Sequence, residues 1–193
     1  VREARIGHAP AIVMSVSFSG ELAYEIHLPN SALFAAYSAL MRAGAAHDIG
    51  HFGARAVDSM RMEKGYLHWK SDLITEFDPY ETGLDRFVCR DKDFLGKAAL
   101  MARGDKKRRR LRMLEIDATH ASPQPSDSLY AGGRLIGSVT SADWGHRTGK
   151  NIAYAFMQPD IVEGITVDII GKPYAARLLN GPVYDPDNSR VKS

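Results

Sequence analysis

Two carboxylates stand four residues apart near the start of the chain, where one of them could hold a ligand. Glu21 and Glu25 lie in the stretch VSFSGELAYEIHLP, residues 16–29. Apolar residues alternate with polar ones through this stretch, a pattern that predicts a half-buried strand. On this alternation alone a solvated strand edge is the more ordinary interpretation of both side chains, and a ligand contact by one of them is the alternative.

A second candidate is a helical stretch of charged residues followed by aromatic ones. Its members are Arg55, Asp58, Arg61, Glu63, Tyr66, Trp69 and Tyr80. Aromatic side chains with a few oriented charges suit a flat heteroaromatic ligand. However, Asp58 and Arg61 are spaced i,i+3 on the predicted helix and could simply form an ion pair. The spacing leaves open whether this region is a ligand site or an amphipathic helix over the core.

Other reactive residue types form no catalytic or metal-binding pattern. His47 and His51 have the spacing of one helix face, but Gly50 lies between them and no HExxH motif is present, so no metal site is predicted. The single cysteine, Cys89, lies among apolar residues and is expected to be a buried thiol. The basic run at 106–110 has no interleaved aromatic residues, which favours a solvated linker over a phosphate-binding patch.

The bulk composition predicts an ordinary globular protein with a sizeable core. The chain has 193 residues, of which 45% are hydrophobic and 25% charged, and its net charge is +2. This balance gives no argument for a nucleic-acid partner, and no apolar run is long enough for a membrane span. One cysteine fits a reducing compartment. The chain opens without methionine and enters a strand almost at once, as expected of a fragment of a longer protein.

The pattern of elements changes in the middle of the chain. Before the basic run, a hairpin is predicted from strands at 11–18 and 22–28 with a turn at Ser19-Gly20, followed by helices at 32–44, 53–65 and 93–104. Asn30 or Ser31 and Asp93 are the expected caps of the first and last helix. After the run, short strands are predicted at 111–117, 128–131, 134–140, 151–157, 165–170 and 173–179. We therefore expect an α+β fold, with a first domain at 1–105 and a small antiparallel, Greek-key-like β-barrel at 106–193.

Five stretches resemble, in the right order, motifs of the glycine cleavage T-protein (aminomethyltransferase) family. SFSGELAYEI is similar to YTGExGxEI, DSMRMEKGY to DSLRLExG, DPYETGLDRFV to TPxEAGLxxxV, and FLGKAAL to FIGKxAL. GRLIGSVTSADWGHRTGKNIAYAFM resembles the barrel signature GxxxGxVTSGxxSPxLxxxIAxAYV. The resemblance covers most of residues 15–180, and it implies the C-terminal part of a folate-binding domain at 1–105, followed by the terminal barrel.

Three variant stretches look more like one branch of this family, the C-terminal region of dimethylglycine and sarcosine dehydrogenases or oxidases. They are MRMEKGYLHWKSDL, ADWGHRTGK and GPVYDPDNSR. In that branch an N-terminal flavin domain oxidises an N-methyl amine, and the T-protein-like region binds tetrahydrofolate and captures the released one-carbon unit. The resemblance therefore implies tetrahydrofolate as the cofactor here, and FAD only on a domain absent from this chain.

The resemblance also assigns roles to individual residues. Glu25 matches the family glutamate that pairs with the pterin ring, whose edge offers two neighbouring N–H donors to a carboxylate. Arg61 matches the arginine of the RLE motif. Where the family has a further arginine this chain has Val57, so either Arg55 substitutes for it or that contact is absent. The folate-binding residues expected on this basis are Glu25, Tyr24, Arg55, Arg61, Tyr66 and Trp69.

The family's catalytic aspartate belongs to the part of the folate domain that precedes this chain. No catalytic residue is therefore expected here, and the chain alone is expected not to catalyse. The expected partners are the folate and the missing N-terminal domains of the same polypeptide, in the cytoplasm or, in a eukaryote, the mitochondrial matrix. Two alternatives remain: a stand-alone aminomethyltransferase or related folate-dependent demethylase, and a non-catalytic binding protein of the same fold.

Overall fold

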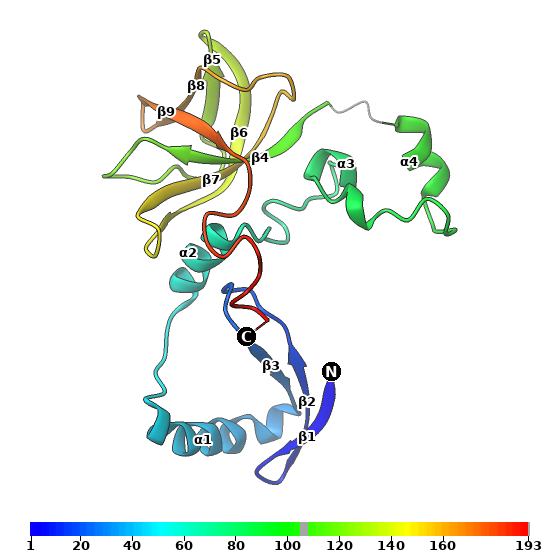
Figure 1. Ribbon diagram of the computed structural model, residues 1–193, viewed down its shortest axis with the longest axis vertical. Helices are drawn as coiled ribbons and strands as arrows, with labels where there is room; N and C mark the ends of the chain where they lie inside the picture. Colours follow the sequence, from blue (N-terminus) through cyan, green and yellow to red (C-terminus); the bar gives the residue numbers. More distant parts are fainter. Residues whose placement is uncertain (105–107, 193) are drawn as a thin grey trace. The chain divides into compact units, whose positions relative to one another are not determined.

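The computed structural model describes residues 1–104 and 108–192, which form two compact units. The first unit comprises Val1–Arg61 with Asp185–Ser193, and the second comprises Met62–Tyr184. Figure 1 shows a small sheet with one long helix in the first unit and a closed barrel in the second. Among the described residues, no helix combines the length and apolar character needed to cross a bilayer. The predicted boundary between 105 and 106 remains a prediction.

The first unit is a three-stranded antiparallel sheet with a helix. Its elements are β1 (Arg2–Ile6), β2 (Ala9–Ser15), β3 (Tyr24–His27), the 3-10 turn η1 (Asn30–Ala32), α1 (Leu33–Gly44), η2 (Ala45–His47) and the start of α2 (Ala54–Lys64). The strand order is β1-β2-β3, so the predicted hairpin is present as β2 and β3. The charged opening of the chain was expected only as a lead into a strand, but it forms β1, which pairs along its whole length with β2.

The predicted turns and helix caps agree less well with the structure than the predicted strands and helices do. Strand β2 ends at Ser15 and β3 begins at Tyr24, so the connection is longer than the predicted strand ends imply. The chain bends within it at the expected Ser19-Gly20, where Gly20 has a φ of 82°. No side chain caps α1, because the chain enters it through η1 with Ala32 at the N-cap. The last predicted helix, α4 (Lys97–Arg103), begins four residues after Asp93 and has Gly96 at its N-cap with a φ of 87°. Cys89 is exposed, so the expected buried thiol is also wrong.

The second unit contains a closed six-stranded antiparallel barrel. Its strands are β4 (Arg110–Ile116), β5 (Ser128–Ala131), β6 (Arg134–Gly145), β7 (Lys150–Met157), β8 (Ile165–Ile169) and β9 (Lys172–Leu179). The order around the barrel is β4-β7-β6-β5-β8-β9, and β9 closes it on β4. Strands β4 to β7 therefore follow the Greek-key order that the sequence predicted. Gly132 and Gly133, both at positive φ, make the tight turn between β5 and β6.

Strand β7 is buried on both faces and packs the barrel against the segment that follows α2. Small side chains, Ala153 and Ala155, point into the barrel core, whereas Ile152, Tyr154 and Phe156 alternate with them and lie in a second core outside. That outer core is completed by Met62 at the end of α2 and by Leu67, Phe77, Leu179 and Val183. The rings of Phe77 and Phe156 stack with centroids 3.7 Å apart. The segment after α2, which includes α3 (Pro79–Thr82) and η3 (Asp85–Phe87), is therefore packed on the barrel wall.

Gly137 in β6 gives a direct test of the barrel packing. A Cβ atom there would lie 2.2 Å from the carbonyl oxygen of Phe156 and 2.7 Å from Cα of Met157, both backbone atoms of β7. We expect Gly137→Ala to lower the free energy of unfolding by about 1 to 3 kcal/mol, because β6 and β7 must separate to admit the methyl group. Urea denaturation followed by circular dichroism measures this. Gly181→Ala, which meets nothing within 4 Å, is the matched control and should leave stability unchanged.

Candidate functional site

Glu25 lies on an open face of the sheet in the first unit. It is a residue of β3 opposite Met14 of β2, and its side chain is 53% exposed. Nε2 of His27 lies 3.2 Å from Oε2 of Glu25, and because a carboxylate can only accept, the imidazole N–H donates this bond. Among the described residues, His27 is the only hydrogen-bond partner of the carboxylate. Glu25 is therefore an accessible acceptor with one partner and with spare lone pairs.

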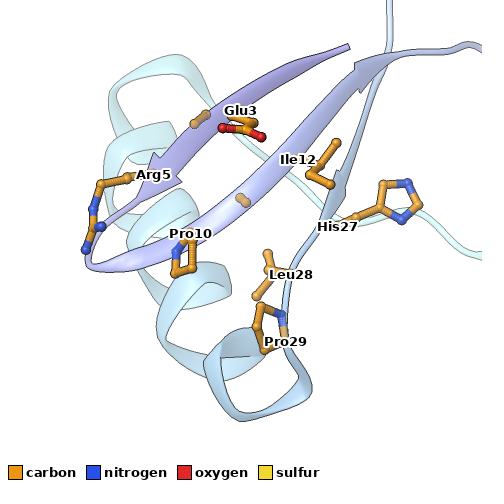
Figure 2. A pocket seen from close by; sticks show the side chains of 9 residues that line it. Glu3, Arg5, Pro10, Ile12, His27, Leu28 and Pro29 are labelled. Atoms are coloured by element: carbon orange, nitrogen blue, oxygen red, sulfur yellow. The ribbon is translucent and has the colours of Figure 1, made fainter.

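The same face of the sheet carries a shallow cavity of about 780 Å³. Glu3, Ile12 and His27 are successive cross-strand neighbours in the register, so their side chains share this face. Figure 2 shows these side chains with Arg5, Pro10, Leu28 and Pro29 around the hollow, and α1 behind the sheet. The volume lies in the range of pockets that bind small organic ligands. Glu25 is two residues along β3 from His27, and so it lies on the same face beside this cavity.

Tyr24 is the neighbour of Glu25 in β3 and is 60% exposed. Successive side chains of a strand point to opposite faces, so Tyr24 and Glu25 are directed to different sides of the sheet. The two predicted contacts are therefore adjacent in sequence but do not converge. Of the two, only Glu25 therefore shares the sheet face that carries the cavity.

The two predicted arginines of α2 have different surroundings. Arg55 is exposed in the first turn of the helix. Arg61 is only 4% exposed, and its Nε lies 3.5 Å from a carboxylate oxygen of Asp58. The i,i+3 ion pair that the spacing allowed is thus present. A ligand role for either arginine stays a prediction.

Tyr66 and Trp69, the predicted aromatic walls, belong to the second unit. Tyr66 lines a pocket of about 290 Å³ together with Leu67, Leu73, Leu111 and Tyr154. Trp69 does not line it and is 66% exposed in a loop that bridges back to Leu73. Four of the six predicted residues thus lie in the first unit and two in the second, and the structure describes each group within its own unit.

Sequence reasoning gave no structural role to three carboxylates that organise the second unit. Glu63, Asp72 and Glu81 are fully buried, each with 0% exposure. A buried carboxylate without donors is strongly unfavourable, so each must be satisfied by hydrogen bonds. Each of them receives donors from a segment that is distant in the sequence.

Glu63 holds the turn between β6 and β7. Its Oε1 accepts hydrogen bonds from the backbone N–H groups of Arg147 and Thr148, both at 2.8 Å, and from Oγ1 of Thr148 at 3.0 Å. Its Oε2 accepts from Nε of Arg147 at 2.5 Å. The guanidinium carbon of Arg147 lies 3.7 Å from the ring centroid of Tyr184. The GHRTGK stretch, singled out from the sequence as a variant of the family pattern, is thus the partner of this glutamate.

Asp72 ties the loop after α2 to β6. It accepts a hydrogen bond from the backbone N–H of His68 at 2.8 Å and from the hydroxyl groups of Thr140 and Ser141 at 2.5 and 2.7 Å. The two hydroxyls are adjacent in sequence, yet they point to the same acceptor because the strand register shifts between Val139 and Ser141. A β-bulge therefore makes this contact possible, and no sequence signal marked it.

Glu81 connects α3 to the start of the barrel. It completes a capping box with Asp78 and accepts from the backbone N–H and the side chain of Arg108, at 3.1 to 3.2 Å. Burial raises the pKa of the Glu81 carboxyl, but hydrogen bonds from Arg108 and from backbone N–H groups outweigh it, so the pKa lies below its ordinary value. Of the predicted solvated linker, Lys106 and Lys107 lie outside the described residues, whereas Arg108 is an ion-pair partner and Arg110 begins β4, so for these two the interpretation is wrong.

Two family models match the chain, one over its first part and one over the barrel. Residues 1–92 match the GCVT N-terminal domain, and residues 109–185 match the glycine cleavage T-protein C-terminal barrel domain. The chain belongs to the glycine cleavage T-protein family, as its motifs predicted.

Two dehydrogenases and one solved aminomethyltransferase are similar to this chain. The chain is 36% identical to sarcosine dehydrogenase, mitochondrial, of Mus musculus over 92% of its length, and 30% identical to dimethylglycine dehydrogenase, mitochondrial, of Rattus norvegicus over 97%. It spans 21% and 23% of the lengths of these two enzymes. The crystal structure of glycine cleavage system aminomethyltransferase T from Bartonella henselae has the same fold, with a TM-score of 0.80 and 22% identity over 90% of this chain and 50% of that chain.

Glu63 gives the first prediction for this region. Glu63→Gln removes the charge that Arg147 pairs with and supplies donors where acceptors are needed, so the free energy of unfolding should fall by about 3 kcal/mol. Urea denaturation measures the change. Glu163→Gln, an exposed glutamate of the same unit, is the control and should shift stability by no more than about 0.5 kcal/mol. Equal stability of the two variants would contradict a stabilising role for the Glu63 contacts.

Glu81 gives a pH-dependent prediction. Because its pKa is lowered in the folded state, its ion pair stabilises the fold above the ordinary glutamate pKa of about 4.3 and is lost as the pH falls through the lower, folded pKa. Arg108→Gln should therefore lower the urea midpoint at pH 7 and lower it much less at pH 3. Arg134→Gln, at an exposed arginine of β6, should change neither. A loss from Arg108→Gln that is the same at both pH values would contradict the assignment.

Proposed function

We propose that this chain is a tetrahydrofolate-binding module that serves one-carbon transfer, with the Glu25 carboxylate as the anchor of the pterin ring. The observation that carries the proposal is the accessible carboxylate of Glu25, which stands on an open sheet face within a motif shared with the T-protein family. The similarity to a sarcosine and a dimethylglycine dehydrogenase along nearly the whole chain supports the same assignment.

The Glu25 carboxylate fits the chemistry of a pterin edge. A pterin offers a ring N–H and an amino group side by side, and an ionised carboxylate accepts two parallel hydrogen bonds of this kind. One bond from His27 uses one of about four lone-pair sites, which leaves both oxygens able to accept. The cavity of about 780 Å³ beside it gives space for a ligand to approach from the open face.

The chain's own residues would bind and orient the folate rather than carry out chemistry. Bound tetrahydrofolate would supply the acceptor for a one-carbon unit. Glu25 fixes the ring by directional hydrogen bonds, and fixed orientation replaces a bimolecular encounter by a local one. Arg55, Arg61, Tyr24, Tyr66 and Trp69 stay as predicted further contacts. No catalytic residue is proposed within this chain.

For the whole protein we propose a flavin-dependent N-methyl amine dehydrogenase, in which this chain is one part of a longer polypeptide. The identities to the two dehydrogenases and the small share of their lengths that the chain spans support this proposal. The alternative of a stand-alone aminomethyltransferase is supported by the shared fold of the Bartonella henselae enzyme. The visible absorption spectrum of the purified full-length protein separates them, because only the dehydrogenase carries a bound flavin.

The test of the site is a titration of the full-length protein with tetrahydrofolate by isothermal calorimetry. Glu25→Gln keeps the shape of the side chain but replaces one acceptor by a donor. We expect it to weaken binding about ten- to a hundredfold, as for the loss of hydrogen bonds to a charged group. Glu21→Gln, from the same motif, is the matched control and should bind as the unchanged protein does.

Three outcomes decide between the hypotheses. Weaker binding by Glu25→Gln, with unchanged binding by Glu21→Gln, supports the proposed anchor. Unchanged affinity of Glu25→Gln, with tight binding by the unchanged protein, overturns the anchor but keeps the folate function. No measurable affinity of the unchanged protein overturns the folate function and favours a non-catalytic binding protein of this fold.

A further inference from the structure

His27 is the hydrogen-bond partner of the Glu25 carboxylate, the proposed pterin anchor. It lies two positions after Glu25 in β3, so both side chains stand on the same face of the sheet. Their contact is 3.2 Å, and the two side chains are 54% and 53% exposed. His27 also lines the cavity on this face, whereas Glu25 does not. The imidazole therefore stands between the carboxylate and the hollow.

The other charged groups of this face are engaged elsewhere or carry the wrong sign. Arg5 of β1 donates a hydrogen bond to the carbonyl oxygen of His8, across the turn that follows its own strand. Glu3 of β1 is a second carboxylate and would repel Glu25 rather than hold it. The direct cross-strand neighbour of His27 is the apolar Ile12, and that of Glu25 is Met14. Within the described part of the chain, His27 is thus the charged or polar neighbour on this face that donates to Glu25.

A half-exposed glutamate on a strand otherwise samples several rotamers. Ordering such a side chain when a ligand binds lowers affinity by roughly three- to tenfold, and a neighbour that already orders it removes this loss. The hydrogen bond from His27 engages Oε2 of Glu25 and leaves Oε1 open. It therefore also restricts the directions from which the two N–H groups of a ligand can approach the carboxylate. Both effects would let His27 influence ligand binding through the Glu25 carboxylate.

We propose that His27 is a positioning residue that preorganises the Glu25 carboxylate for a ligand presenting two adjacent N–H donors. The inference rests on the proposed function, since it concerns the same anchor. It differs from the family pattern that led to Glu25, because that pattern ends before position 27 and assigns nothing to it.

The test is a double-mutant cycle on tetrahydrofolate binding by the full-length protein. The variants are His27→Leu, His27→Gln, Glu25→Gln and the double variant Glu25→Gln/His27→Leu. We expect His27→Leu to weaken binding about three- to tenfold. His27→Gln keeps an N–H donor near the carboxylate and should stay within about twofold of the unchanged protein. The double variant should bind no more weakly than Glu25→Gln alone, because His27 acts only through the carboxylate.

A control and two contrary results keep the inference distinct from the proposed function. His8→Leu, at an exposed histidine in the turn between β1 and β2, should leave affinity unchanged. If Glu25→Gln weakens binding but His27→Leu does not, the role of His27 is wrong and the proposed function stands. If His27→Leu weakens binding equally with and without the Glu25 carboxylate, His27 acts independently of Glu25 and the inference is again wrong. If Glu25→Gln itself binds normally, the anchor fails and the inference falls with it.

Equal urea midpoints of His27→Leu and the unchanged protein are expected, since the side chain is half exposed. This measurement separates positioning from folding: a lowered midpoint of His27→Leu, together with no coupling to Glu25 in the cycle, would overturn the positioning role in favour of a structural one.

Discussion

The burial of three carboxylates is the constraint on which the second unit depends. Glu63, Asp72 and Glu81 are all withdrawn from water, and an ion in such surroundings is tolerable only when donors surround it. Their donors come from the β6–β7 turn, from the bulge in β6 and from Arg108, two residues before β4. Because Glu63 in the last turn of α2 and Asp72 and Glu81 in the segment after it each contact a different part of the barrel, residues 63–81 have three fixed points on the barrel wall.

Apolar contacts fill the space between these fixed points. The outward side chains of β7 meet Met62, Leu67 and Phe77, so the strand is buried on both faces. Burial of apolar area provides most of the stabilisation, but it is not directional. The carboxylates supply direction, because each accepts only from donors placed at particular positions. Together they make an irregular stretch of chain, with little periodicity of its own, into an ordered part of the unit.

The elements that could be predicted from sequence are those with strong local patterns. The barrel strands were located closely because alternation and glycine turns mark them, as at Gly132 and Gly133. β1 was missed because its charged residues hide the alternation of an exposed strand. The capping box of Asp78 and Glu81 is readable as D-P-x-E, but the contact of Glu81 with Arg108 is not, since 27 residues separate the partners. For the site, the motif identified Glu25, whereas its contact with His27 required knowledge that both stand on one strand face.

Because β7 is buried on both faces, a recombinant piece that contains the barrel cannot begin at the first barrel strand without exposing apolar side chains. A recombinant piece cut to the family barrel, residues 109–185, would contain every strand of the barrel and yet lose Met62, Leu67 and Phe77. Ile152, Tyr154 and Phe156 would then form an uncovered apolar row on its outer surface. The ion pair of Arg108 with Glu81 would be lost as well, since both residues lie outside the piece. We expect such a piece to self-associate through this apolar row. A piece that keeps β7 covered on both faces therefore has to begin near Met62 at the end of α2, more than forty residues before the first strand of the barrel.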